Sequence, residues 1–265
     1  MPESPHTEIV KILESIPPIS LGEMDSIKLM NRIDTKYLTD EATLVKVLKD
    51  AAAAGSRALE AEGTKLSPYN SIYFDTPTLR MFMDHRNKKL RRQKVRTRVY
   101  VNSSDSYLEI KLKNNKGRTK KKRTSIPLSE MEDFSKDKEA TDYLANYSAF
   151  SIDELSPELS TEFDRITLVN PSKTERLTID TGLHFTNYRN GKKASLEDAV
   201  IIELKQDGRA SSQIKGIFLN HRVKPLRLSK YCVAVTLTDP SVRSGRFKEK
   251  VRAIEKTINK KIKVI

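Results

Sequence analysis

Several segments of this sequence alternate strictly between apolar and ionic side chains. Residues 95–101 read Val-Arg-Thr-Arg-Val-Tyr-Val, and residues 108–113 read Leu-Glu-Ile-Lys-Leu-Lys. Residues 200–205 repeat the pattern with one exception, and residues 32–36 and 176–180 carry charges at every second position. Side chains of a β-strand point alternately to the two faces of a sheet, so each segment predicts a strand with one apolar and one ionic face.

Cations greatly outnumber acids on the ionic parity of these strands. The cations are Arg32, Lys36, Arg96, Arg98, Lys111, Lys113, Lys121, Arg123, Arg165, Arg176, Lys205 and Arg227, with Lys230 just beyond the last predicted strand. The acids are Asp34, Asp75, Glu109, Asp180 and Glu203. Any one strand fits a simple solvated face, but such a face normally mixes its charges. An excess of eight positive charges favours a surface that binds a polyanion through Arg forks and Lys point charges.

Helices are predicted between and after these strands. Apolar spacing and capping residues place them at residues 7–16, 40–54, 129–147, 211–220, 229–237 and 247–262. Asn190-Gly191 is a hairpin signal. We therefore expect an α+β fold in which the strands form a closed antiparallel β-barrel, a tunnel with a cationic interior, flanked by helices.

One domain is expected to span residues 1–265, with a helical N-terminal segment at 1–30 and an amphipathic basic helix at 243–265. That last helix could lie on a membrane surface, but such helices more often pack on their own domain.

Composition narrows the classes of function. The chain has 265 residues and a net charge of +14, with 37% apolar residues, which is enough for a packed core. No apolar run approaches the ~20 residues of a membrane span, and the N-terminus has no secretory signal. Cys232 is the only cysteine, which excludes an internal disulfide and suggests a cytoplasmic protein. The charge points to a polyanionic partner, but no P-loop, zinc spacing or RNA-binding aromatic motif accompanies it.

Two glutamates of the cationic strands have similar neighbours in the sequence. Glu109 and Glu203 each lie two residues before a lysine on the same face. A carboxylate beside bound phosphate is repulsive unless a divalent cation lies between them, and Mg²⁺ and Mn²⁺ commonly bridge carboxylates to phosphates. The alternative is an ion pair with a neighbouring Arg or Lys. For Glu109 the two alternatives stay open.

These stretches resemble the VTC domain, the polyphosphate polymerase branch of the CYTH-like triphosphate tunnel metalloenzymes, in its bacterial stand-alone form. Nine stretches match in order: residues 32–37, 73–76, 95–98, 108–111, 115–118, 165–167, 176–180, 202–205 and 228–231. The resemblance implies a closed tunnel that binds ATP with Mn²⁺ or Mg²⁺ and transfers the γ-phosphate to a growing polyphosphate chain. The expected partners are thus ATP, inorganic phosphate or pyrophosphate, and polyphosphate rather than nucleic acid.

The resemblance also implies roles for individual residues. Phosphates would be held by Lys36, Arg96, Arg98, Lys111, Arg165, Arg176, Arg227, Ser229 and Lys230. Of these, Arg96, Arg98, Lys111, Arg176 and Lys230 are the expected catalytic residues. Glu203 would hold the metal, with Glu109 as a second candidate. Strand parity adds Arg32, Lys113, Lys121, Arg123 and Lys205 to the phosphate-binding set.

One departure from the superfamily bears on the reaction. Its triphosphatases open with Glu-x-Glu-x-Lys, whereas residues 32–36 here read Arg-Ile-Asp-Thr-Lys, with a single acid. This favours a polymerase, whose acceptor phosphate is already ionised. The resemblance covers no accessory SPX or transmembrane domain, so coupling to a membrane would need a separate membrane partner. The alternatives are a triphosphatase or polyphosphatase in the same tunnel, and a non-catalytic protein that binds polyphosphate or RNA.

Overall fold

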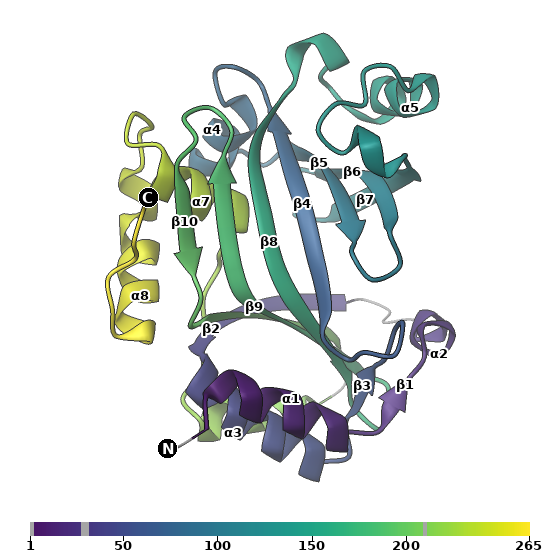
Figure 1. Ribbon diagram of the computed structural model, residues 1–265, viewed down its shortest axis with the longest axis vertical. Helices are drawn as coiled ribbons and strands as arrows, with labels where there is room; N and C mark the ends of the chain where they lie inside the picture. Colours follow the sequence, from purple (N-terminus) through teal and green to yellow (C-terminus); the bar gives the residue numbers. More distant parts are fainter. Residues whose placement is uncertain (1–2, 28–31, 209–210) are drawn as a thin grey trace.

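The protein folds as a strongly curved antiparallel sheet surrounded by helices (Figure 1). The computed structural model describes residues 3–27, 32–208 and 211–265. The strands run in the order β12-β2-β11-β9-β8-β4-β5-β6-β7, with β10 beside β9 and β3 beside β8. Every ladder is antiparallel except that of β1 with β3. The α+β class and the large antiparallel sheet thus agree with the sequence prediction.

The elements have the following bounds. The strands are β1 (Pro18–Ile19), β2 (Arg32–Asp40), β3 (Arg57–Leu59), β4 (Ser67–Asp75), β5 (Arg92–Tyr100), β6 (Asp105–Lys113), β7 (Thr119–Ser125), β8 (Ser156–Val169), β9 (Glu175–Asn187), β10 (Lys193–Leu196), β11 (Ala199–Asp207) and β12 (Lys224–Pro225). The α-helices are α1 (Pro5–Ser15), α2 (Leu21–Ser26), α3 (Glu41–Ala53), α4 (Arg80–Arg86), α5 (Lys138–Tyr147), α6 (Gln213–Asn220), α7 (Lys230–Thr238) and α8 (Lys248–Ile258).

One predicted helix starts later than expected. The Ser-x-x-Glu pattern at Ser129 predicts a helix start, but Ser129 lies in a single 3-10 turn that follows Pro127. The helix begins at Lys138, where the side chain of Asp137 accepts the backbone N–H of Ala140 at 3.0 Å. The intervening segment places Phe134 in the core, so packing rather than capping decides its path.

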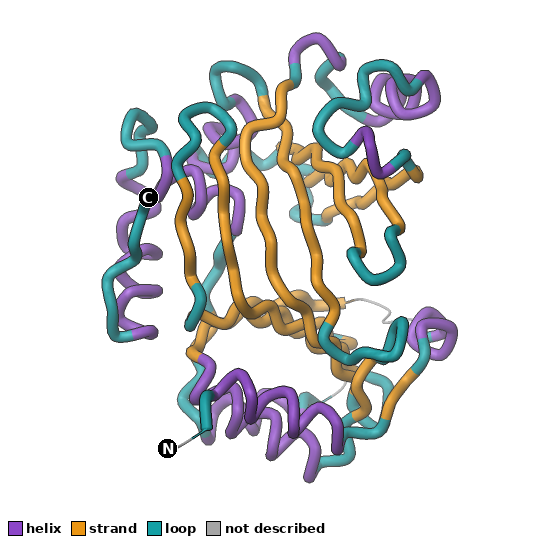
Figure 2. The backbone as a smooth tube through the Cα atoms, viewed as in Figure 1, coloured by secondary structure: helices purple, strands orange, loops and turns teal. Residues whose placement is uncertain are grey.

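The sheet bends sharply along its two longest strands. β8 and β9 shift register between Glu162 and Asp164, and Gly182 beside this point has φ +57°, which a residue with a side chain rarely adopts. The first half of β9 pairs with β11 and its second half with β10, whereas β8 pairs with β4 from Ser156 to Arg165. The bend turns a long ribbon into a curved surface, as Figure 2 shows.

Helices cover the convex, apolar face of this surface in two groups. α1, α3 and α6 pack on β2, β11, β9 and β8, with Leu48, Ile179 and Phe218 in their core. α5 packs on β4, β5 and β6, with Phe134 and Leu144 in a separate core.

A third group, α4, α7 and α8, packs at the end of the sheet beside β10, where α8 lies at the left of Figure 1. The apolar stripe of α8, with Ile254 fully buried, is used against its own domain, as the more common alternative for the tail predicts. No helix within the described ranges is long and apolar enough to cross a membrane.

The sheet does not close into a barrel. Across the residues that the structure describes, β7 and β12 end the strand order and form no ladder with each other. β12 has only two residues, one of them Pro225, which lacks an N–H to continue a ladder. β7 is highly charged, as exposed edge strands often are. The predicted tunnel is therefore an open trough, and "trough" below means the concave, ionic face of the sheet.

Candidate functional site

Strand register brings the predicted cations together on the trough face. In the ladder of β5, β6 and β7, Arg96 lies opposite Glu109, which lies opposite Arg123. In the same ladder Lys111 lies opposite Lys121. On the other wall, Lys36 and Thr178 flank Glu203, and Asp34 and Arg176 flank Lys205. The parity choice of Lys121 and Arg123 in the basic run agrees with this register.

Glu109 lies at the centre of one ionic group. Its side chain is fully buried, and one oxygen accepts hydrogen bonds from the guanidinium of Arg96 while the other forms an ion pair with Lys121. Arg96 also donates to the hydroxyl of Tyr73 at 3.0 Å. Burial works to raise the pKa of Glu109, but Arg96, Arg98 and Lys121 outweigh it and hold the pKa far below its usual range. This geometry favours the ion-pair alternative for Glu109.

Asp180 organises a second group. It binds Arg165 through two parallel hydrogen bonds of 2.6 and 2.8 Å, and it also forms an ion pair with Lys230 at the start of α7. The ammonium of Lys230 lies 3.4 Å from the ring centre of Phe163. Burial and the nearby Arg165 outweigh Asp180 and lower the pKa of Lys230 to about 7. Lys230 can therefore gain or lose its charge near neutral pH.

Glu203 forms a third group that is more open to solvent. Its oxygens lie 2.7 Å from Lys36 Nζ and 3.4 Å from Lys205 Nζ, and 25% of its side chain is exposed. Burial works to raise the pKa of Glu203, but Lys205 and Lys36 prevail and lower it to about 2. At the rim, Arg32 pairs with Asp34 at 2.6 Å in the same way. Each of these carboxylates therefore holds one or two cations in place.

Two trough cations, buried Arg98 and half-buried Lys111, have no carboxylate partner among the described residues. Arg98 donates to Ser71 Oγ at 2.9 Å and lies against the rings of Tyr69 and Phe163. Burial and the neighbouring Arg96 lower its pKa to about 10. Lys111 makes no hydrogen bond or ion pair to the part of the chain that is described, and Arg96 and burial lower its pKa well below the usual value.

The two walls of the trough are close enough to interact. The charge of Lys111 on β6 acts on Glu203 on β11, although four strands separate β11 from β6 in the sheet order. An anion between these walls would meet Arg98, Lys111 and the lysines of Glu203 together.

α7 lies across one end of the trough. Tyr231 stacks on Tyr73 at 5.1 Å and donates a 2.6 Å hydrogen bond to Asp75. Asp75 also accepts the backbone N–H groups of Met81 and Phe82, which fixes the start of α4. Strand parity counts Asp75 among the acids of the ionic face, but the structure buries it completely beneath α7. The concave face is thus partly filled by a helix, which strand alternation alone cannot indicate.

The remaining predicted residues lie toward the rims. Arg123 is exposed, with its guanidinium 4.6 Å from the ring centre of Tyr107. Arg176 donates to the backbone oxygen of Met24 at 2.7 Å, so α2 lies against that wall. Lys113 and Arg227 make no ion pair to described residues, and Ser229 caps α7. The structure therefore places all the candidate residues on or beside one face.

Sequence reasoning missed two cations of this face. Arg92 and Lys94 continue the inner parity of β5 and lie opposite Lys113 and Lys111. Lys94 Nζ donates to Ser229 Oγ at 2.8 Å, which joins the strand to the start of α7. The ionic parity could have been extended upstream from Arg96 by two and four residues to find them.

The oxygen donors of the trough determine whether a divalent cation fits there. Among the described residues no three His, Cys, Asp or Glu side chains gather into a metal-binding cluster. Glu203 is ionised, partly exposed and held only by two flexible lysines, so it could contribute one carboxylate to an ion that phosphates and water otherwise coordinate. Glu109 is fully buried between Arg96 and Lys121, so an ion would first have to displace a buried cation there.

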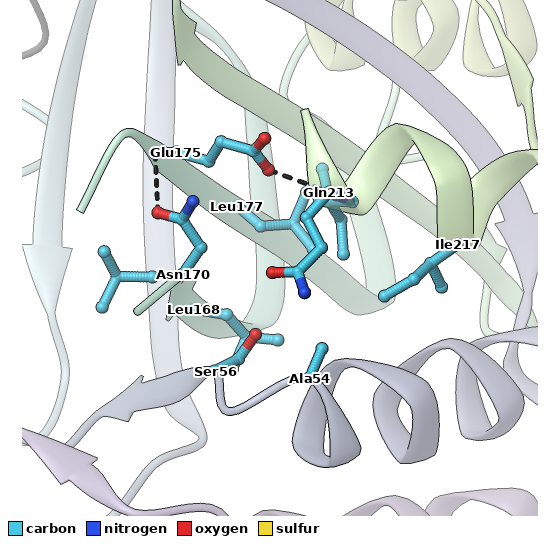
Figure 3. A pocket seen from close by; sticks show the side chains of 10 residues that line it. Ala54, Ser56, Leu168, Asn170, Glu175, Leu177, Gln213 and Ile217 are labelled. Carbon is cyan, nitrogen blue, oxygen red and sulfur yellow. Dashed lines mark hydrogen bonds between the residues drawn. The ribbon is translucent and has the colours of Figure 1, made fainter. Parts of the chain in front are cut away.

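The pocket in Figure 3 lies on the opposite, apolar side of the sheet. There Glu175 accepts the backbone N–H of Ile214 at 3.3 Å, and Asn170 accepts the backbone N–H of Glu175 at 2.9 Å. Only about 10 Å³ is open to a water-sized molecule, which is room for a single water. This pocket is a packed joint between α6 and the sheet rather than a substrate site.

Comparisons with known proteins agree with this geometry. A family model described as the VTC domain matches residues 31–238. The chain is similar to a candidate adenylate cyclase from Bacillus halodurans, with a TM-score of 0.51 and 14% identity, over 76% of this chain and 96% of that one. It is also similar to a Hippeastrum protein described as a candidate adenylyl cyclase with a dominant triphosphatase activity. That likeness has a TM-score of 0.50 and 13% identity, over 77% and 95% of the two chains. At such identities these structures show the fold alone, and no curated protein matches.

Proposed function

Because the chain belongs to the VTC domain family, we propose that it is a metal-dependent polyphosphate polymerase, which transfers the γ-phosphate of ATP to the end of a polyphosphate chain in the trough. The observation that carries this proposal is a pair of cations without carboxylate partners among the described residues, buried Arg98 and half-buried Lys111, on the wall opposite Glu203. Burying unpaired cations is costly, and anionic phosphates would compensate them.

The trough residues would act by holding phosphates and spreading their charge. Arg98 offers a planar fork for two phosphate oxygens, and Lys111 adds a point charge from the same wall. Lys36 and Lys205 can exchange the carboxylate of Glu203 for phosphate oxygens. Mn²⁺ or Mg²⁺, held by Glu203, would neutralise charge on the transferred phosphoryl group. Phosphoryl transfer depends mainly on such positioning and charge neutralisation.

The acceptor would be an ionised terminal phosphate, which needs no general base. The rim acid Asp34 is engaged with Arg32, so this strand offers no free carboxylate to activate water. That pairing favours transfer over hydrolysis. The open side of the trough gives a chain longer than a triphosphate a place to lie.

The test is to incubate the purified chain with ATP and Mn²⁺ and to resolve the products on a denaturing gel stained for polyphosphate. We expect a metal-dependent ladder that disappears in Glu203→Gln and persists in Glu197→Gln, an exposed carboxylate in the turn between β10 and β11. Release of orthophosphate without a ladder would replace the polymerase with a triphosphatase. Unchanged ATP, with polyphosphate or RNA bound to folded protein, would indicate a binding protein instead.

A further inference from the structure

A second group of cations lies where the trough meets α7 and α8, and it has a different character from the first. We call it the collar: Lys88, Arg92, Lys94, Lys113, Arg227 and Lys250. It draws on the loop before β5, the adjoining ends of β5 and β6, the segment before α7, and α8. Figure 1 shows α4, α7 and α8 gathered at this end of the sheet.

Three contacts fix the collar in place. Arg92 lies opposite Lys113, and Lys94 lies opposite Lys111, in the β5–β6 ladder. Lys94 Nζ is tied to Ser229 Oγ, two residues after Arg227. Lys250 lies 5.5 Å from the ring centre of Phe247, which in turn packs against Phe82 at 5.6 Å. Four of the six collar cations therefore lie on strands or helices: Arg92, Lys94, Lys113 and Lys250.

No collar cation forms an ion pair with an acid in the described ranges. Asp84 on the neighbouring helix α4 pairs with Lys89 at 2.7 Å instead. Burial and then Arg92 and Arg227 lower the pKa of Lys113, while burial, Lys88 and Arg227 lower that of Lys250. Beneath them the pKa of His85 falls to about 3, through burial and then Lys94 and Arg92. The cations thus repel one another, which a bound anion would relieve.

Resting on the proposed function, we propose that the collar binds the phosphates of a linear polyphosphate chain beyond those held in the trough, and so selects polymer over triphosphate. The inner positions of β5 from Arg92 to Arg98 form one continuous row, and six residues of a strand span about 20 Å. Three linked phosphates are much shorter than this row, whereas a longer chain can lie along it. Phe247, the ring beside Lys250, is buried and cannot stack a base, so a bare phosphate polymer fits better than RNA.

The test compares two probes on the full chain by titration calorimetry, without nucleotide or metal. The probes are tripolyphosphate and long-chain polyphosphate, each measured at several salt concentrations. The variant is the double substitution Lys113→Ala with Lys250→Ala. The matched control is Lys46→Ala with Lys215→Ala, which removes two exposed charges from α3 and α6 behind the sheet.

We expect the collar variant to bind long-chain polyphosphate about 10-fold more weakly, with a salt slope smaller by about two, because two phosphate contacts are lost. Tripolyphosphate affinity should change less than about 3-fold, and the control variant should match the wild type with both probes. Because the assay measures binding alone, this outcome stands whether or not the chain makes polymer from ATP.

Three results would overturn the proposal. Equal losses for both probes would mean that the collar only attracts anions at a distance. Equal effects of the collar and control variants would mean that net charge alone matters. Displacement of polyphosphate by a single-stranded RNA of equal charge at equal concentration would show that the collar does not select a bare phosphate chain.

Discussion

The trough and the collar are both cationic, but they manage their charge in opposite ways. In the trough, Glu109, Asp180 and Glu203 each hold two cations at fixed positions, and among the described trough cations Arg98 and Lys111 stand beside these pairs without a carboxylate of their own. In the collar, the cations face one another without a carboxylate among the described residues. Paired charges are preorganised and specific in direction, whereas a row of unpaired charges leaves a surplus that a long anion can neutralise. The difference suggests that the trough is built for chemistry and the collar for retention of a chain.

The largest effect should follow from removing the acid that holds the trough together. Glu109→Gln leaves Arg96 and Lys121 facing each other beside Arg98, and breaking a buried ion pair costs about 3–5 kcal/mol. Folding lowers the pKa of Glu109, so the stability that its charged form contributes is fully present above its unfolded pKa. This stability is lost as the pH falls toward the folded pKa. Denaturant unfolding at pH 7 and at pH 4 should show a gap between wild type and variant that narrows in acid. A gap that stays constant would contradict the assignment.

Arg98→Ala should be the most damaging change to the reaction itself. We expect a loss of about 10²-fold or more in polymer synthesis, since a preorganised donor to phosphate oxygens is removed. Arg98 has no acid partner among described residues, so its removal leaves no carboxylate unpaired and the fold should persist. The comparison is Arg123→Ala, which changes an exposed residue of the edge strand β7 and should cost less activity. Full turnover in a folded Arg98→Ala protein would exclude Arg98 from the site.

Lys230 should make phosphate binding depend on pH near neutrality. Its pKa of about 7 means that it is charged below pH 7 and loses its charge as pH rises. Tripolyphosphate affinity should therefore fall with rising pH, by up to about 10-fold per unit, relative to Lys230→Arg, which stays charged. The ratio of the tripolyphosphate affinities of the two proteins cancels the effect of protons that bind to the ligand. Parallel pH profiles would show that Lys230 does not titrate in this range.

The smallest expected effect is a difference in stability between one collar variant and one trough variant. Lys113→Ala in the collar should change the free energy of unfolding by no more than about 0.5 kcal/mol, because it removes a repelled charge. Lys121→Ala in the trough should cost about 1–3 kcal/mol, because Glu109 loses one of its partners. Both lysines lie on the inner face of adjacent strands. Equal losses from the two substitutions would erase the distinction between paired and unpaired cations.

Strand alternation predicted the ionic face well, because it depends only on the two-residue period of a β-strand. It placed Lys121 and Arg123 on the inner parity of β7, where the register shows them opposite Lys111 and Glu109. It could not predict which acid would hold which cations, since Lys230 reaches Asp180 from a helix 50 residues further along the chain. Asp75 shows the same limit, because its burial depends on α7 crossing the concave face.

The local sequence pattern could not predict whether the barrel closes, for a similar reason. Whether two edge strands meet depends on the cumulative bend of the whole sheet, which here arises at the bulge near Glu162 and at Gly182. The extent of the basic face was underestimated because the strand was taken to start at Val95, whereas β5 begins at Arg92.

The open edge between β7 and β12 changes how a polymer can be handled. A closed tube can admit a linear chain only by one of its ends, so substrate and product must be threaded along its axis. Where the two described edges share no ladder, no backbone hydrogen bond between them has to break for a chain to enter or leave sideways. How many additions occur per encounter would then depend on how tightly the walls grip the chain, and not on topology.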